Sequence, residues 1–145
     1  MYIGKASEVT GELYEALERL LPQLSPNKPV PGWAELTALV KSESSTLLIA
    51  RYPDESGEIA GILSLTVYRV PTGIRSIVED VIVEENLRGR GIGKALLEYA
   101  IILARKSGAN GITLTSNPRR EAANHLYQSM GFERHQTNVY IYTLK

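Results

Sequence analysis

Glycines at every second position mark the stretch LRGRGIGKALL, residues 87 to 97. Gly89, Gly91 and Gly93 allow the backbone to curl with its N–H groups pointing inward. A helix-forming run begins at the same place, so its positive dipole end adds to the attraction for an anion. Three basic side chains can supply further charge at the rim: Arg88, Arg90 and Lys94. The stretch therefore predicts a phosphate-binding loop.

Two common phosphate loops have a different spacing. The dinucleotide fingerprint needs a third glycine where Lys94 stands, and the Walker pattern needs glycine at Arg88 and a hydroxyl at Ala95. No carboxylate or metal motif accompanies the loop, so a cofactor diphosphate held without Mg²⁺ suits it better than a nucleotide whose phosphate is transferred. The alternative is that the glycines serve tight packing and the arginines form a solvated rim.

Composition limits the possible partners. The 145 residues carry sixteen basic and sixteen acidic side chains, so a broad nucleic-acid surface is not expected. The chain has no cysteine and two isolated histidines, His125 and His135, so we expect no metal site. It shows neither a signal peptide nor a membrane-spanning run, so we expect no membrane partner and a cytoplasmic location. Length and composition predict one globular domain over residues 1–145.

The first half of the sequence predicts a strand, two helices and three further strands. The strand is residues 1–6, and an apolar stripe predicts a helix with Ser7 as its N-cap, closed by Pro22. Residues 22–32 form an irregular proline-rich loop before a short helix at 33–40. Short turn sequences separate three strand-like runs, which we expect to form an antiparallel meander: 46–52, 59–70 and 74–85.

The second half predicts a βαβ unit and a closing strand. A helix follows the glycine loop and ends at the sequence KSGANG. ITLTSN, residues 112–117, reads as the parallel strand of a right-handed crossover. Asn117 and Pro118 are expected to be the N-cap and first residue of a further helix. VYIYTLK, residues 139–145, predicts a final strand. The fold class is α/β with a mixed sheet flanked by helices.

Two motifs in this order resemble the GNAT N-acetyltransferase superfamily. RGRGIG, residues 88–93, matches its acyl-CoA pyrophosphate signature Arg/Gln-x-x-Gly-x-Gly/Ala, and the strand SIVEDVIV stands directly before it. NPRREAANHLYQSMGF, residues 117–132, resembles the second motif, Ala-x-x-Leu-Tyr-x-x-x-Gly-Phe. The resemblance implies a mixed sheet of six to seven strands with about four helices. It also implies a V-shaped opening between the fourth and fifth strands, residues 77–83 and 111–116.

The resemblance also implies how acetyl-CoA binds as a co-substrate. The glycine loop would hold the pyrophosphate, with Ile92 beginning the helix. Pantetheine would pair like an added strand with backbone groups of Val81, Ile82 and Val83, and one N–H there would meet the thioester oxygen as an oxyanion donor. Asn117 and Asn124 could bind pantetheine or phosphate, although Asn117 is equally explained as a helix cap. Arg120, where many members have Asn, could meet the 3′-phosphate.

The implied reaction is direct acetyl transfer from acetyl-CoA to a primary amine of a small molecule or protein, in a ternary complex. An ammonium acceptor must lose a proton, and Glu79 is the expected base because it interrupts an apolar strand and shares a face with Val81 and Val83. A bulge would exchange the faces of Glu79 and Asp80. Three alternatives to Glu79 as the base remain open. The base is Asp80, or it is a water relay, or both acids have a purely structural role.

Tyr127 matches the residue that in many family members protonates the CoA thiolate, its alternative being a core tyrosine. The acceptor side is expected near residues 22–36 and 133–139, where Trp33 would be either a wall or a core anchor. The competing function is a non-catalytic acyl-CoA-binding or regulatory domain. Either function is compatible with a monomer or a homodimer.

Overall fold

A five-stranded sheet organises the first of two compact units, Met1–Thr115 and Ser116–Lys145, which together are the 145 residues that this computed structural model describes. The sheet order is β1-β2-β3-β4-β5. The elements of the first unit are β1 (Tyr2–Lys5), α1 (Gly11–Leu24), α2 (Trp33–Lys41), β2 (Ser45–Tyr52), β3 (Glu58–Val70), β4 (Gly73–Val83), the 3-10 turn η1 (Glu85–Leu87), α3 (Ile92–Lys106) and β5 (Ile112–Thr113).

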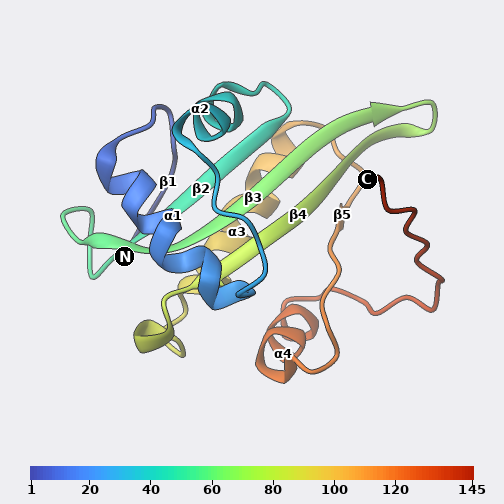
Figure 1. Cartoon of the computed structure of the whole chain (residues 1–145). Helices are drawn as coiled ribbons and strands as arrows, with labels where there is room; N and C mark the ends of the chain where they lie inside the picture. Colours follow the sequence, from blue (N-terminus) through green and yellow to red (C-terminus); the bar gives the residue numbers. More distant parts are fainter. The chain divides into compact units, whose positions relative to one another are not determined.

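Helices cover both faces of this sheet. Leucines of α1 and α2 pack against Ile49, Ile62 and Ile82, which share one face. On the other face a Cβ added to Gly61 would lie 3.3 Å from side chains of Ile92 and Leu96, so α3 packs closely there. Figure 1 shows α1 and α2 in front of the strands and α3 behind them. The predicted antiparallel meander is confirmed, because β1 to β4 pair in sequence order.

The first helix differs from its prediction at both ends. Its N-cap is Thr10, whose Oγ1 accepts a hydrogen bond of 3.1 Å from the Leu13 N–H, so Ser7 was the wrong cap. Pro22 lies inside the helix, which runs on to Leu24. The predicted apolar stripe is confirmed, since Leu13, Leu17 and Leu20 are buried.

Parallel pairing between β4 and β5 is very short. The ladder joins Ser76 to Ile112 and Ile77 to Thr113, and β4 then continues for six residues without a partner on that side. The expected opening between the fourth and fifth strands therefore begins after Ile77. The sheet has five strands instead of six to seven, because residues 114–117 leave the ladder and no strand forms at 139–145.

The second unit consists of a turn, the helix α4 (Glu121–Ser129) and an extended C-terminal segment. The predicted helix start at Pro118 is wrong. Asn117 Oδ1 accepts 2.9 Å from the Arg119 N–H, and this turn delays the helix to Glu121. The predicted final strand is also wrong for the isolated chain, in which residues 133–145 form neither helix nor strand. The helix count of about four is confirmed.

None of the helices combines the length and the apolar composition that crossing a bilayer requires.

Candidate active site

The glycine loop has left-handed backbone at two alternate positions. Gly89 and Gly91 have φ angles of 80° and 81°, and a Cβ at either would meet no atom within 4 Å. Their glycine identity thus follows from conformation, and the space above the loop is open. The first helical bond of α3 joins the Ala95 N–H to the Gly91 carbonyl at 3.0 Å. The preceding N–H groups of Ile92, Gly93 and Lys94 therefore have no acceptor within the helix, as an anion cradle requires.

The three basic side chains of the loop have different surroundings. Arg88 donates from Nε to the Val83 carbonyl at 3.1 Å. Arg90 lies over the Tyr52 ring, 5.6 Å from its centroid, and is 3.3 Å from the hydroxyl. The Lys94 ammonium is 3.8 Å from the Glu98 carboxylate, and both side chains are largely exposed. Arg88 and Arg90 are thus anchored by the ends of β4 and β2, while Lys94 has only a weak surface partner.

A bulge interrupts β4 next to the predicted base. Ser64 pairs with Glu79 and Ile62 pairs with Ile82, so Leu63 alone stands opposite Asp80 and Val81. Asp80 has a φ of 52°, a left-handed conformation that Asp tolerates better than most residues.

This bulge corrects the predicted face of Glu79. Glu79 lies on the face of Ile62 and Ile82, which α1 and α2 cover, whereas Val83 pairs with Gly61 on the α3 face. Glu79 therefore does not share a face with Val81 and Val83, because the extra residue shifts the alternation by one. Both acids are exposed.

The end of β4 presents the backbone that was predicted to bind pantetheine. Ile82 is buried, and Val81 and Val83 are half-buried. The Val83 carbonyl is held by Arg88, so this group is already engaged within the chain. Val81 and Ile82 have no strand partner on the β5 side.

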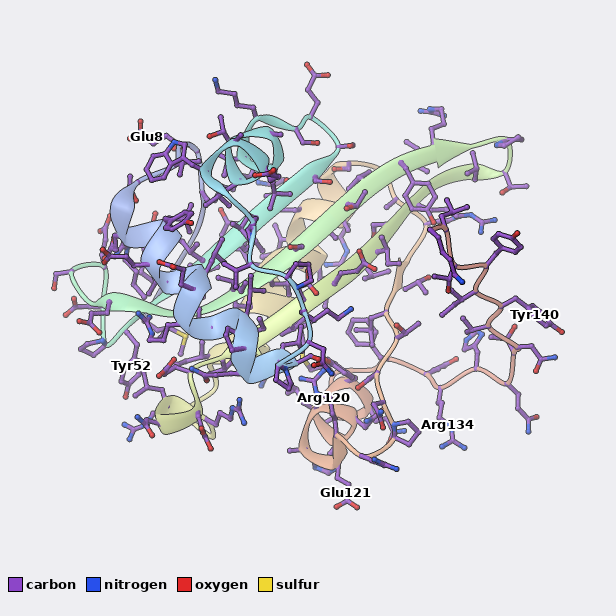
Figure 2. All side chains as sticks on the ribbon, in the orientation of Figure 1. Glu8, Tyr52, Arg120, Glu121, Arg134 and Tyr140 are labelled. Carbon is purple, nitrogen blue, oxygen red and sulfur yellow. The ribbon has the colours of Figure 1, made fainter.

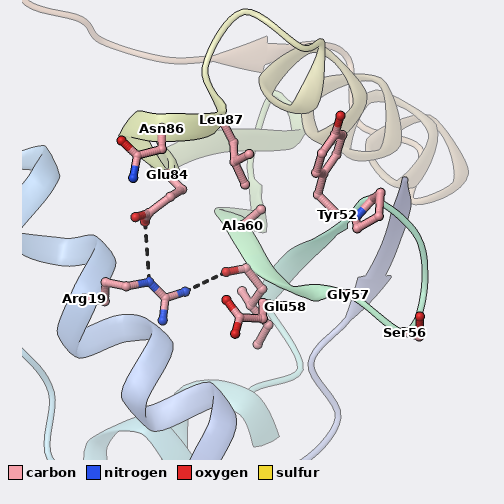
Figure 3. A pocket seen from close by; sticks show the side chains of 11 residues that line it. Arg19, Tyr52, Ser56, Gly57, Glu58, Ala60, Glu84, Asn86 and Leu87 are labelled. Carbon is pink, nitrogen blue, oxygen red and sulfur yellow. Dashed lines mark hydrogen bonds and ion pairs between the residues drawn. The ribbon is translucent and has the colours of Figure 1, made fainter.

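A hollow of about 590 Å³ lies beside the loop, and Figure 3 shows its lining. Arg19 of α1 crosses it, donating 2.7 Å to the Ile59 carbonyl and lying 3.5 Å from Glu84. None of the predicted site residues lines this hollow, so it is not the predicted acetyl-transfer site. Its lining shows how α1 is joined to the end of β4.

Gln23 completes that junction and was missed by the sequence reasoning. Its amide donates to Glu84 at 2.9 Å, and its carbonyl oxygen accepts from the Glu85 N–H at 2.9 Å. No local sequence pattern could have predicted this contact, because the partners are more than sixty positions apart in the sequence. Gln23 and Arg19 therefore fix the segment that enters the glycine loop.

Tyr127 is the buried aromatic residue of the second unit. Its ring meets Phe132 edge-on at 6.0 Å between centroids, and 6% of the residue is exposed. Burial raises the pKa of the Tyr127 phenol above its usual 10, and the nearby Arg120 guanidinium acts in the opposite direction. The phenol is consequently protonated at neutral pH.

The polar residues before Tyr127 form a local network. Asn124 Nδ2 donates to the carbonyls of Asn117 and Arg120 at 2.9 and 2.8 Å, so its donors are used within the unit. Asn117 is exposed and closes the turn before α4, and Arg120 is exposed at the helix start. The structure thus gathers these three residues with Tyr127 in the second unit, and the glycine loop with β4 in the first.

Residues predicted near the acceptor have surface positions. Trp33 is 51% exposed and lies against Tyr14, with 5.7 Å between ring centroids, so it is not a core anchor. His125 and His135 are both exposed.

Comparison with known families decides the class of the protein. The model of the acetyltransferase (GNAT) family matches residues 11–132, which include the glycine loop and Tyr127. The chain belongs to the GNAT acetyltransferase family. The members of this family are acyltransferases. The match agrees with the two sequence motifs, RGRGIG and NPRREAANHLYQSMGF, that resemble those of the family.

Individual GNAT relatives share about a third of their matched residues with the chain. The L-amino acid N-acyltransferase MnaT of Escherichia coli (strain K12) is 34% identical over 89 residues, covering 58% of this chain and 52% of that protein. The glucosamine 6-phosphate N-acetyltransferase of Trypanosoma brucei brucei is 32% identical over 87 residues, covering 58% and 57%. The matched part of the chain thus spans about half the length of these relatives.

Solved structures support the GNAT fold over almost the whole chain. An aminoglycoside acetyltransferase from an uncultured soil metagenomic sample, in complex with sisomicin, superposes with a TM-score of 0.85 at 20% identity. This alignment covers 99% of the chain and 96% of that structure. A Trypanosoma brucei acetyltransferase gives a TM-score of 0.77 at 23% identity, with coverages of 98% and 100%.

Proposed function

We propose that the protein is an acetyl-CoA-dependent N-acetyltransferase that transfers the acetyl group directly to a primary amine of a small molecule or protein in a ternary complex. The observation that carries the proposal is the pair of left-handed glycines, Gly89 and Gly91, at the exposed start of α3. Open space lies where their Cβ atoms would stand, so the loop can receive a bulky anion. Family membership makes acetyl-CoA the natural source of that anion.

The geometry supports a distinct position for each part of acetyl-CoA. The N–H groups of Ile92, Gly93 and Lys94 are suited to hold the pyrophosphate, with Arg88, Arg90 and Lys94 adding charge. Pantetheine would follow β4 beyond Ile77, where Val81 and Ile82 lack a strand partner. Asn117, Arg120 and Asn124 remain proposed contacts of the cofactor, with Asn124 limited to accepting through its Oδ1 because its donors are occupied.

Glu79 is proposed as the base that removes a proton from the acceptor ammonium. It lies on the sheet face covered by α1 and α2, and the connection between these helices falls within residues 22–36, where the acceptor side is expected. Because the amine attacks only when unprotonated, a carboxylate on the acceptor face supports catalysis. Asp80 occupies the bulge itself, where its left-handed backbone gives it a structural reason to be present.

Tyr127 is proposed as the acid that gives a proton to the departing CoA thiolate. Its burial supports this role, because a buried phenol stays protonated at neutral pH and a low-dielectric site favours neutral over charged groups. The proton passes from the phenol oxygen to sulfur, and the phenolate recovers a proton from solvent after the thiol leaves.

A thiol-release assay with acetyl-CoA and a panel of primary amines tests the proposal. We expect amine-dependent release of free CoA, together with a rise in Tm on adding CoA. A rise in Tm with no amine-dependent release across the panel would favour the non-catalytic acyl-CoA-binding or regulatory domain. Absence of any Tm change at millimolar CoA would contradict both functions.

The Gly91→Val variant tests the cradle itself. Its side chain would enter the open space above the loop, so we expect loss of CoA binding by calorimetry. Gly11→Val is a matched control, since a Cβ at Gly11 also meets nothing within 4 Å and its backbone is not left-handed. Equal CoA affinity in both folded variants would remove the loop from the binding site.

A further inference from the structure

Arg90 of the glycine loop is held by a side chain from a distant strand. Its guanidinium lies 5.6 Å from the centroid of the Tyr52 ring, and its Nη1 donates to the Tyr52 hydroxyl at 3.3 Å. Tyr52 is the last residue of β2 and stands 38 positions before Arg90 in the sequence. Figure 2 shows it at the end of the strand, beside the segment that leads into the loop. A cation over an aromatic face is restricted in direction, so Arg90 is held in place although it is exposed.

This contact leaves the charge of Arg90 uncancelled. The ion pairs of the chain all involve other basic residues, so Arg90 has no carboxylate partner. The Tyr52 hydroxyl uses one of the guanidinium N–H donors, and the others remain free. Arg90 also stands directly before Gly91, the N-cap of α3. An unpaired guanidinium at this place is suited to bind an anion together with the N–H groups of the loop.

The end of β2 gives Tyr52 a fixed place. Its backbone pairs with Glu58 across the hairpin, and the neighbouring Arg51 donates to the Gly57 carbonyl at 3.0 Å. Two further hydrogen bonds join Arg51 to the first turn of α1. Tyr52 itself is half-buried. A ring held in this way restricts Arg90 before a ligand arrives, so less side-chain entropy is lost on binding.

We propose that Tyr52 is a positioning residue that holds the Arg90 guanidinium against a phosphate group of the cofactor. This role rests on the proposed function, because acetyl-CoA is the source of the phosphates. Guanidinium and phosphate form paired, charge-assisted hydrogen bonds, which depend on the orientation of the planar guanidinium. CoA offers two such groups, the pyrophosphate and the 3′-phosphate of the ribose, which present the same oxygen chemistry to Arg90.

Calorimetry of CoA binding measures the contribution of Tyr52. Tyr52→Leu removes the ring and the hydroxyl, so we expect the CoA dissociation constant to rise about fivefold. Tyr52→Phe keeps the ring and should raise this constant about twofold. Tyr14→Leu is the matched control, because Tyr14 is also half-buried but packs against Trp33, and this variant should keep the natural affinity. Unchanged affinity in Tyr52→Leu would overturn the proposal.

A double-mutant cycle with Arg90→Ala separates positioning from a structural role. If Tyr52 acts through Arg90, Tyr52→Leu should have no effect on CoA affinity in the Arg90→Ala background. The same loss in both backgrounds would overturn the proposal, because it would show that Tyr52 supports the loop in another way. Where Tyr52→Leu does not fold, Tyr52→Phe takes its place in the cycle, and its smaller loss should vanish beside Arg90→Ala.

The same cycle with 3′-dephospho-CoA identifies the phosphate. Coupling that persists with this ligand assigns the contact to the pyrophosphate, and coupling seen only with CoA assigns it to the 3′-phosphate. Absence of coupling with both ligands, in a natural chain that binds CoA, would overturn the role of Tyr52 and leave the proposed function intact. A natural chain that binds neither ligand would contradict the proposed function itself, and the role of Tyr52 with it.

Discussion

Glu79 and Asp80 stand next to one another at the bulge of β4, and their backbones differ. Asp80 holds the left-handed conformation with a φ of 52°, whereas Glu79 remains in register opposite Ser64. Strand pairing fixes the direction in which the Glu79 side chain points. At Asp80, by contrast, the residue type is partly explained by the left-handed backbone of the bulge. This difference allows the two carboxylates to be tested separately.

Glu79→Gln should abolish the acid limb of the kcat/KM profile, because the carboxylate must be ionised to accept a proton. We expect a loss of about 10² in rate at neutral pH, measured by thiol release. Asp80→Asn is the matched control, since Asn also tolerates the left-handed region and should keep the profile. An unchanged profile in Glu79→Gln would transfer the role of base to water or to another group.

Tyr127→Phe should retain CoA affinity and lose most turnover. The ring and its edge-on contact with Phe132 are kept, so the fold is preserved while the proton is removed. We expect kcat to fall by about 10² or more and the CoA dissociation constant to change less than twofold. Tyr68→Phe, on an exposed tyrosine of β3, controls for hydroxyl loss elsewhere. Full turnover in Tyr127→Phe would exclude it as the acid.

Among the secondary-structure elements, α1 controls the segment that enters the glycine loop. Gln23 bonds both Glu84 and the Glu85 N–H, so it acts as a positioning residue for the loop. Gln23→Ala should raise the KM for acetyl-CoA about fivefold and leave kcat nearly unchanged, since a loss of about 1 kcal/mol in holding the loop, the contribution of one hydrogen bond, corresponds to about a factor of five. Glu18→Ala, an exposed position on the same helix, should change neither constant. A fall in kcat with constant KM would show that Gln23 does not act through cofactor binding.

The first turn of α1 is joined to β2 by a bidentate ion pair. Arg51 donates to both oxygens of Glu12, at 2.9 and 2.6 Å, and this contact lowers the pKa of the Glu12 carboxyl below 4.5. The stabilisation is therefore present above pH 4.5 and is lost as the pH falls through the lowered pKa. Glu12 is half exposed, so solvent weakens the pair.

Glu12→Gln should consequently lower the free energy of unfolding by about 0.5 kcal/mol at pH 7, and the difference should vanish in more acidic solution. Urea titrations at several pH values measure it. A Glu12→Gln difference that persists unchanged below the lowered pKa would show that the pair does not act through the charge of Glu12.

At the scale of the whole molecule, the sequence predicts those features of the fold that depend on residues close together in the chain. Strand-like runs separated by short turn sequences predicted the meander, and the glycine spacing located the loop whose left-handed residues the structure contains. The face of Glu79 could not be predicted, because a bulge depends on the pairing of two strands. Nor could Gln23, whose partners are distant in sequence. The start of α4 was misplaced because the Asn117 side chain bonds two residues ahead instead of capping the helix.

The final strand shows a different limit of sequence reasoning. The pattern VYIYTLK has the composition of a strand, but a strand forms only where a neighbouring backbone is available. Residues 133–145 of the second unit form neither helix nor strand. The composition of a segment therefore indicates a preference for extended backbone, whereas the pairing that makes it a strand depends on the rest of the fold.

The prediction of a single domain over residues 1–145 can be tested by unfolding. The unit Ser116–Lys145 has about 30 residues and no disulfide, which is too short to fold independently. We therefore expect it to unfold together with Met1–Thr115. Trp33, the only tryptophan, reports on the larger unit, and a dye on His125→Cys reports on the smaller one. Coincident urea transitions are expected for one cooperative domain. Separate midpoints would show that the two units unfold independently, since a shared cooperative core must release both probes together.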